Sequence, residues 1–181
     1  MRDDPDRRAP LTPASFAAAF RGASSALWCI AAAVLGERSH AEDVLQEAAL
    51  VGLSKLDDFE PGTSFAAWMG QIVRFTALNH RRKLARRAHG EGAAIEASAQ
   101  AGTPAFAEAG IDPRMLAALE TLGETARACL LLKVVLELDY AEIAELLAIP
   151  QGTAMSHVHR ARAHLRTELG TADPDLAERR P

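Results

Sequence analysis

The chain has 181 residues, of which 49% are hydrophobic and 5% aromatic, and its formal net charge is −4. This length has room for one larger domain or two small ones, and the alanine-rich, aromatic-poor composition favours helices. The negative net charge excludes a uniform nucleic-acid-binding coat, so any DNA contact must come from local basic segments. There is no signal peptide and no run of 18 apolar residues, so we expect a soluble, cytoplasmic protein without membrane insertion.

The first predicted element is an amphipathic helix that comes after a short leader. Residues 1–13 are charged and carry prolines, and they predict a flexible leader. Apolar side chains then recur at helical spacing until Gly36, where the helix is expected to end. The apolar positions of this helix are Phe16, Phe20, Ala23, Leu27, Ile30 and Val34.

The second predicted helix has a strongly acidic side. Ser39 and Glu42 have the spacing of a capping box, which predicts that the helix starts there. Its apolar side is expected to comprise Val44, Leu45, Ala48, Ala49, Leu53 and Leu56, and its solvent side Glu42, Asp43, Gln46 and Glu47. Residues 37–60 contain seven acids against two bases. This balance suits a basic protein partner, and an ordinary solvated face is the open alternative.

The third predicted helix is basic. A Pro-Gly-Thr-Ser turn at residues 61–64 precedes it, and Trp68, Ile72 and Phe75 recur at core spacing, with display of Trp68 to a ligand as the alternative. Residues 61–90 contain no acid and six cations, which are Arg74, Arg81, Arg82, Lys83, Arg86 and Arg87. An acidic helix beside a basic one indicates two partners, a protein and a nucleic acid.

The segment after the basic helix predicts a break between two domains. Residues 90–112 are small, with glycines and a proline, and predict a flexible linker. Pro113 is expected to start a new helix, and residues 124–136 form an apolar segment expected to pack beneath the last two helices of the chain. Residues 170–181 predict a flexible tail. Cys29 and Cys129 each lie in an apolar helical run, which favours buried thiols over a disulfide or a metal pair.

Residues 140–165 predict two helices joined by a tight turn, a helix-turn-helix. The first helix has the apolar stripe Ile143, Ala144 and Leu147. The turn is expected at residues 148–152, because Pro150 and Gly152 break the helix there, and Thr153 is expected to cap or open the second helix. In that helix the inward stripe is Ala154, Val158, Ala161 and Leu165. No acid occurs from Leu146 to Thr167, which favours contact with phosphates, and an ordinary surface hairpin is the alternative.

Two segments, residues 41–83 and 116–165, resemble the two domains of bacterial sigma factors of the extracytoplasmic-function group of the sigma-70 family. The resemblance implies an all-α fold of two small helical domains, a region 2-like domain at residues 14–89 and a region 4-like helix-turn-helix domain at residues 113–169. It implies a factor that binds core RNA polymerase and directs promoter recognition and transcription initiation, in a stress or envelope response. An anti-sigma factor is an implied further partner.

The resemblance also assigns roles to residues. Docking on a coiled coil of the polymerase largest subunit would fall to Asp43, Gln46 and Glu47. Contact with the −10 promoter element would fall to Trp68, Arg74, Asn79, Arg81 and Arg82. Contact with the −35 element would fall to Thr153, Met155, Ser156, His157, His159 and Arg160. No catalytic residue, metal or cofactor is implied, since the polymerase performs the chemistry.

Three residues depart from the family pattern and keep an alternative open. Phe75 stands where many relatives have Asn, while Met155 and His157 stand where cations are usual. These departures fit a different promoter, weaker binding, or a sigma-like protein that mainly engages an anti-sigma factor or polymerase. An enzyme is disfavoured because the chain has no glycine-rich phosphate loop, metal-spaced His/Cys set or nucleophile–base pair. A plain helix-turn-helix repressor would leave the acidic and basic helices of the first domain unexplained.

Overall fold

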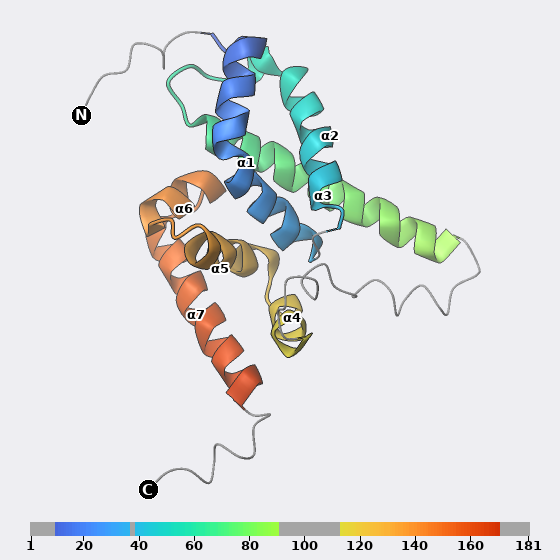
Figure 1. Cartoon of the computed structure of the whole chain (residues 1–181), viewed down its shortest axis with the longest axis vertical. Coiled ribbons are helices and arrows are strands. Elements are labelled where there is room, and N and C mark those ends of the chain that lie inside the picture. Colours follow the sequence, from blue (N-terminus) through green and yellow to red (C-terminus); the bar gives the residue numbers. More distant parts are fainter. Residues whose placement is uncertain (1–9, 37–38, 91–112, 171–181) are drawn as a thin grey trace, which may run out of the picture.

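The computed structural model describes residues 10–36, 39–90 and 113–170, and all the regular structure in these ranges is helical. The first domain contains α1 (Pro13–Leu35), α2 (Ala41–Leu53), the short 3-10 helix η2 (Leu56–Asp58) and α3 (Phe65–Gly90). The second contains α4 (Pro113–Glu120), α5 (Glu124–Val135), α6 (Tyr140–Leu147) and α7 (Gln151–Gly170). The all-α class with a C-terminal helix-turn-helix is confirmed (Figure 1). Most of the predicted leader, linker and tail lies outside the described residues.

Helix α1 forms the centre of the molecule. A capping box that the sequence pattern did not reveal fixes its start, with Thr12 as N-cap bonded reciprocally to Ser15 and proline in the first turn. It ends at Gly36, whose φ of 82° is the left-handed conformation that glycine adopts without strain. By length and composition α1 is apolar enough to cross a membrane. In this structure Leu27 and Ile30 are fully buried, so α1 is a core helix.

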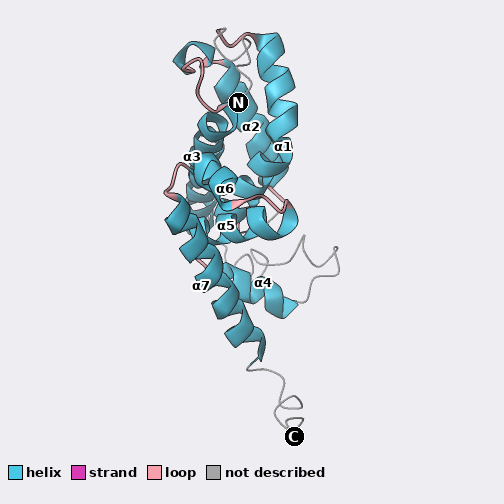
Figure 2. Ribbon diagram, turned by 90° about the vertical axis from the view of Figure 1, so that its left-hand side faces the viewer, coloured by secondary structure: helices cyan, strands magenta, loops and turns pink. Residues whose placement is uncertain are grey.

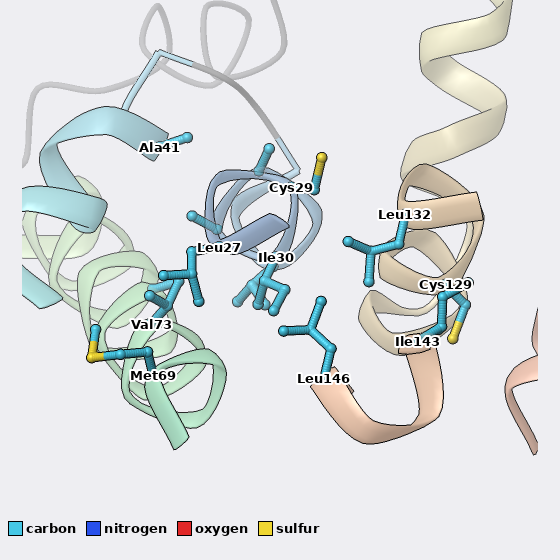
Figure 3. Packing of buried hydrophobic residues seen from close by; sticks show 14 of the residues in the cluster. Leu27, Cys29, Ile30, Ala41, Met69, Val73, Cys129, Leu132, Ile143 and Leu146 are labelled. Atoms are coloured by element: carbon cyan, nitrogen blue, oxygen red, sulfur yellow. The ribbon is translucent and has the colours of Figure 1, made fainter. Parts of the chain in front are cut away.

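One continuous hydrophobic core joins the two domains. Helix α1 packs against α2 and α3 on one side and against α5 on the other, and α3 also contacts α6. Figure 3 shows Ile30 of α1 between Val73 of α3 and Leu146 of α6. Burying each such aliphatic side chain contributes about 1.5–3 kcal/mol. The domains are therefore packed on one another, with α4 and the end of α7 farthest from the start of α1 (Figure 2).

The crossing of α3 over the end of α6 depends on Gly70. A Cβ atom at this position would lie 3.0 Å from the Leu146 carbonyl oxygen and 3.2 Å from the Ile30 side chain. A larger residue would push the two helices apart, because such contacts are tighter than packed interiors tolerate. Next to this crossing the Gln71 side-chain amide donates to the Leu147 carbonyl at 3.4 Å.

The start of α2 differs from the prediction. The helix begins at Ala41 with His40 as N-cap, and no side chain caps it. His40 has φ −98° and ψ 0°, whereas a capping side chain needs an extended N-cap backbone to reach the first turn. The Ser39 hydroxyl instead lies 3.3 Å from the His40 ring nitrogen Nδ1. The predicted capping box at Ser39 and Glu42 is therefore wrong, although the helix itself is confirmed.

The turn of the helix-turn-helix also differs from the prediction. Ala148 adopts the left-handed conformation, with φ 53°, and its N–H bonds back to α6. Helix α7 already begins at Gln151, so Gly152 and Thr153 lie inside its first turn. A left-handed alanine costs about 1 kcal/mol, and the recovered carbonyl bonds at the end of α6 offset that cost. The predicted turn is therefore confirmed at residues 148–150 and wrong at Gln151 and Gly152, which belong to α7, and Thr153 lies in the first turn of that helix without capping it.

Candidate nucleic-acid and protein interfaces

The outward side of α2 is acidic, as the sequence predicts. Asp43, Gln46 and Glu47 are all exposed and lie on one side of the helix. Glu47 forms an ion pair with α3, because the Lys83 Nζ atom lies 3.8 Å from the Glu47 carboxylate. Both partners of that pair are about half exposed, so it contributes at most about 1 kcal/mol. The carboxylate of Asp43 forms no ion pair with a described residue.

An exposed apolar residue at the C-terminal end of this surface was not predicted from the sequence. Leu50 is 69% exposed and lies one helical turn beyond Gln46 and Glu47. Leu53, which the pattern had assigned to the core, is also exposed because the chain leaves α2 there and turns into η2. The α2 face, defined as Asp43, Gln46, Glu47 and Leu50, thus combines charge with an exposed leucine. Charged, polar and apolar groups on one helix side are compatible with a protein interface and with a solvated face, so the alternative stays open at this point.

Helix α3 has three distinct sides. Met69, Val73 and Ala77 are buried against the core. Arg74 and Arg81 lie on the flank that faces the second domain. Phe75 is 60% exposed on the side away from the core, so its predicted core position is wrong. At about 100° per residue Phe75 points roughly 160° away from Val73, which its spacing from Trp68 alone does not reveal.

Two arginines expected to contact DNA are held against the second domain. The Arg74 guanidinium donates two hydrogen bonds to the same Glu124 carboxylate oxygen. One comes from Nη2, and the other comes from Nε at 3.1 Å. Arg81 Nη1 donates to the Val34 carbonyl at the end of α1 at 3.0 Å, and its Nη2 lies 4.0 Å from Glu124. We call Arg74, Arg81 and Glu124 the interdomain clasp. In this conformation the clasp directs both arginines towards α1 and α5.

A third arginine supports the clasp from α5. Arg127 Nη2 donates to the Leu122 carbonyl at 2.8 Å, and its Nη1 group lies against Gly36 at the end of α1. Burial lowers the pKa of Arg127, the nearby Glu120 carboxylate raises it, and the Arg81 cation lowers it further. Two cations therefore meet at the C-terminus of α1, where the helix dipole favours positive charge.

Trp68 is only partly available to a ligand. Its indole ring is half-buried and packs edge-on to Phe59, with centroids 5.4 Å apart, and tilted against Phe65 at 5.9 Å. Asn79 and Arg82, by contrast, are exposed on the same outward side of α3. The five residues expected at the −10 element thus differ in their accessibility to a ligand. Asn79 and Arg82 are open, Trp68 is half-buried, and Arg74 and Arg81 belong to the clasp.

The outer surface of α7 gathers four of the six residues expected at the −35 element. They line a pocket of about 590 Å³ together with Tyr140 of α6, and they are Met155, Ser156, His159 and Arg160. Arg160 is oriented by its Nε, which donates to the Ser156 carbonyl at 3.2 Å. The inward stripe of Ala154, Val158 and Ala161 is buried as predicted.

Thr153 and His157 lie outside this pocket on a half-buried flank of α7. Burial lowers the pKa of His157, and the Arg160 cation lowers it further. Both effects favour the neutral imidazole of His157 in the free protein. His164 lies further along α7, and its ring nitrogen Nε2 is 2.6 Å from the Thr121 hydroxyl of α4, so it has a structural contact.

Within the described ranges, no group of three or more His, Cys, Asp or Glu side chains could hold a metal ion. Cys29 and Cys129 are both buried free thiols, as predicted, and burial raises the pKa of Cys129 to about 11. The exposed side chains on α2, α3 and α7 offer charges and hydrogen-bonding groups, which suit these surfaces to binding.

Comparisons with known proteins agree with this arrangement. The family model Sigma-70 region 2 matches residues 20–87, and the model Sigma-70, region 4 matches residues 113–165. ECF RNA polymerase sigma factor EcfG of Rhodopseudomonas palustris strain TIE-1 is 30% identical over 141 residues, covering 77% of this chain and 76% of that protein. RNA polymerase sigma factor CarQ of Myxococcus xanthus is 31% identical over 140 residues, covering 76% of this chain and 79% of that protein.

The fold matches solved structures over most of its length. The sigma factor RpoE from Bartonella quintana, in complex with the anti-sigma factor NepR, matches with a TM-score of 0.60 and 23% identity, covering 87% of this chain and 98% of that one. CnrH in complex with the cytosolic domain of CnrY gives a TM-score of 0.60 at 21% identity, covering 90% of this chain and 92% of that one. At these identities the likeness concerns the fold alone.

The two matched regions define the class: a transcription protein of the sigma-70 type, with region 2 in the first domain and region 4 in the helix-turn-helix domain. Within that class the chain belongs to the extracytoplasmic-function (ECF) group of RNA polymerase sigma factors.

Proposed function

We propose that this protein binds core RNA polymerase through the α2 face and directs transcription initiation through α3 and α7. The observation that carries the proposal is the change of charge between neighbouring helices. Asp43 and Glu47 are exposed on α2, whereas residues 61–90, which include α3, contain no acid and six cations. One small domain with two surfaces of opposite charge is suited to hold a protein and a nucleic acid at once.

In this proposal Met155, Ser156, His159 and Arg160 contact the −35 element in the major groove. A helix-turn-helix inserts its second helix there, and the pocket beside Tyr140 lies on the exposed side of that helix. Asn79 and Arg82 contact the −10 element directly, while Arg74 and Arg81 do so only after the clasp opens. We further propose a cytoplasmic, non-enzymatic protein that serves a stress or envelope-response regulon, on the strength of family membership.

An anti-sigma factor is a further proposed partner. The fold match RpoE is seen in complex with the anti-sigma factor NepR, and the fold match CnrH in complex with the cytosolic domain of CnrY. The second candidate function, a sigma-like protein with weak or no DNA recognition, is favoured by one observation. Neither Met155 nor His157 brings a fixed positive charge to α7.

The test is a titration of the full chain against core RNA polymerase, and then transcription in vitro on genomic fragments. Reversing Asp43 and Glu47 to Lys should weaken core binding severalfold with unchanged helix content, since both side chains are exposed. Leu50→Ala should weaken it too, because in this proposal the exposed Leu50 side chain becomes buried against the polymerase.

The matched control is the double reversal of Glu137 and Glu145, which are also exposed and change the net charge equally but lie in the second domain, outside the acidic segment 37–60. Equal affinity of wild type and Asp43→Lys/Glu47→Lys would contradict the docking assignment. Tight core binding without transcription from any fragment would favour the sigma-like alternative.

A further inference from the structure

The exposed side of α7 carries one large apolar side chain among polar ones. Met155 is 48% exposed, and of the exposed large hydrophobic residues in the described chain it is the one that lies on α7. It is the fifth residue of the helix, next to the exposed Ser156. This position in the first half of α7 is important, because a helix-turn-helix contacts base edges with the N-terminal residues of its second helix.

Tyr140 adds a second apolar wall beside Met155. Helix α6 lies next to the start of α7 (Figure 1), and Tyr140 is half-buried at the first position of α6. Both residues line the pocket of about 590 Å³, whose other lining residues are the polar Ser156, His159 and Arg160. We call the part of the pocket that is lined by Met155 and Tyr140 the apolar slot.

The tyrosine ring of the apolar slot is held in place by its own domain. Asp139 and Glu142 form a capping box that fixes the start of α6. The Lys133 Nζ atom lies 5.1 Å from the centroid of the tyrosine ring and donates to the Leu138 carbonyl at 2.8 Å. A cation over the face of a ring is attracted to it, so this contact restrains the ring. One wall of the slot is therefore fixed, whereas the flexible thioether of Met155 can adjust to a ligand.

The chemistry of Met155 determines which part of a DNA duplex it can contact. A thioether has no charge and is only a weak hydrogen-bond acceptor, so it gains little from a phosphate. Among the groups that base pairs present in the major groove, the C5 methyl group of thymine is the apolar one. An apolar slot on the exposed side of a helix that enters the major groove is therefore matched to that methyl group.

We propose that the apolar slot takes the C5 methyl group of a thymine, which makes Met155 a specificity-determining residue. The inference rests on the proposed function and adds to it the identity of one base in the −35 element. The absence of acid from Leu146 to Thr167 favours DNA over a basic protein as the occupant. Met155 stands where cations are usual in the family pattern, so this thymine preference is particular to this chain.

The experiment uses the full chain together with core RNA polymerase, because the proposed function places the chain on DNA in that complex. Duplexes that the complex binds are selected from a library randomised over about ten consecutive base pairs, the length of one helical turn. Each thymine of a selected duplex is then replaced in turn by deoxyuridine, which differs only in lacking the C5 methyl group. At one position this replacement should weaken binding by the wild type about fourfold, the effect of burying one methyl group.

Variants of Met155 show whether the methyl group is bound by this side chain. Met155→Gln should bind the thymine and uracil duplexes equally, because the amide has nearly the length of the thioether but no apolar end. Met155→Leu should retain most of the methyl effect, since leucine is apolar and of similar volume. The matched control is Val135→Gln, at an exposed apolar residue of the second domain outside α7, which should keep the wild-type ratio.

Arg160→Ala separates loss of affinity from loss of the methyl contact. Arg160 lines the same pocket but lies outside the apolar slot. Its removal should weaken binding of the thymine and uracil duplexes by the same factor, so that their ratio stays at the wild-type value.

Two results would overturn the inference: no thymine whose methyl group affects binding by the wild type, or a full methyl effect in Met155→Gln. Either result leaves the proposed function standing, provided that the complex still prefers particular duplexes. A complex that prefers no duplex sequence contradicts the proposed function and the inference together. A methyl effect that depends on Met155, in a complex that never starts transcription, contradicts only the proposed function.

Discussion

The interdomain clasp makes a prediction about stability that a double-mutant cycle can measure. Glu124→Gln keeps the shape of the side chain and removes its charge, while Arg74→Gln removes the partner. The Arg74 and Glu124 side chains are 39% and 22% exposed, so the pair lies between a surface pair and a buried one. An exposed pair is worth about 0.2–1 kcal/mol, and a charge-assisted, two-pronged contact is worth more. We expect each single variant to lose about 1–2 kcal/mol and the coupling energy between them to be about 1 kcal/mol.

The assay is urea unfolding of the full chain monitored by far-UV circular dichroism, which reports on both domains. A loss of 1 kcal/mol lowers the urea midpoint by about 0.3–1 M, since the free energy of unfolding falls by about 1–3 kcal/mol per molar urea. Glu124 also lies in the first turn of α5, where a negative charge favours the helix whether or not Arg74 is present. The double-mutant cycle removes the effect of Glu124 on the α5 helix dipole, because that effect is the same with and without Arg74 and cancels in the coupling energy.

Glu145→Gln is the control for loss of one acid, since Glu145 is exposed on α6 and forms no ion pair with a described residue. The coupling should shrink as ionic strength rises, because the pair is partly open to solvent. A coupling energy within about 0.3 kcal/mol of zero at low salt would show that the contact does not hold the domains together.

Two further predictions concern packing and pH. Gly70→Ala should destabilise the chain by about 1–3 kcal/mol, because its Cβ would press on the Leu146 carbonyl; Gly22→Ala, where nothing lies within 4 Å, should be neutral or slightly stabilising in the same urea titration. His157 should titrate below its usual 6.5 in an NMR pH series, since burial and Arg160 both disfavour its cation. Its contribution to stability is then complete above about pH 6.5 and is lost as the pH falls towards the folded-state pKa, whereas a midpoint at or above 6.5 would contradict the burial.

The sequence was a good guide wherever a periodic pattern extended over several turns. The stripes of α1 and α7 were predicted because four or more apolar residues recur at helical spacing, which leaves one possible inward face. The helix-turn-helix and the acid-free basic helix were predicted from composition and spacing in the same way. Buried thiols at Cys29 and Cys129 were predicted from their apolar surroundings.

The details that the sequence concealed depend on contacts between distant segments or on local backbone angles. Arg74 and Arg81 looked like DNA contacts, but Glu124, about fifty residues away in the chain, engages both of them in the folded state. Phe75 fitted a core spacing from Trp68, and only the position of Val73 shows that it points outward. The left-handed Ala148 could not be predicted from composition, because glycine was the expected residue for that conformation.

The clasp and the exposed side of α3 together explain how one basic helix can serve the fold and the proposed nucleic-acid ligand at once. A helix with six cations and no acid repels itself, and pairing some cations with Glu47 and Glu124 relieves that repulsion. The pairs fall on the flanks of α3 because α2 and α5 supply acids only there. The side opposite the core meets no acidic helix among the described residues, so Arg82 and Arg86 keep their charges for an external anion. Because electrostatic attraction to nucleic acid depends on the number of unpaired cations rather than on net charge, a chain of net charge −4 can still present a DNA-binding surface.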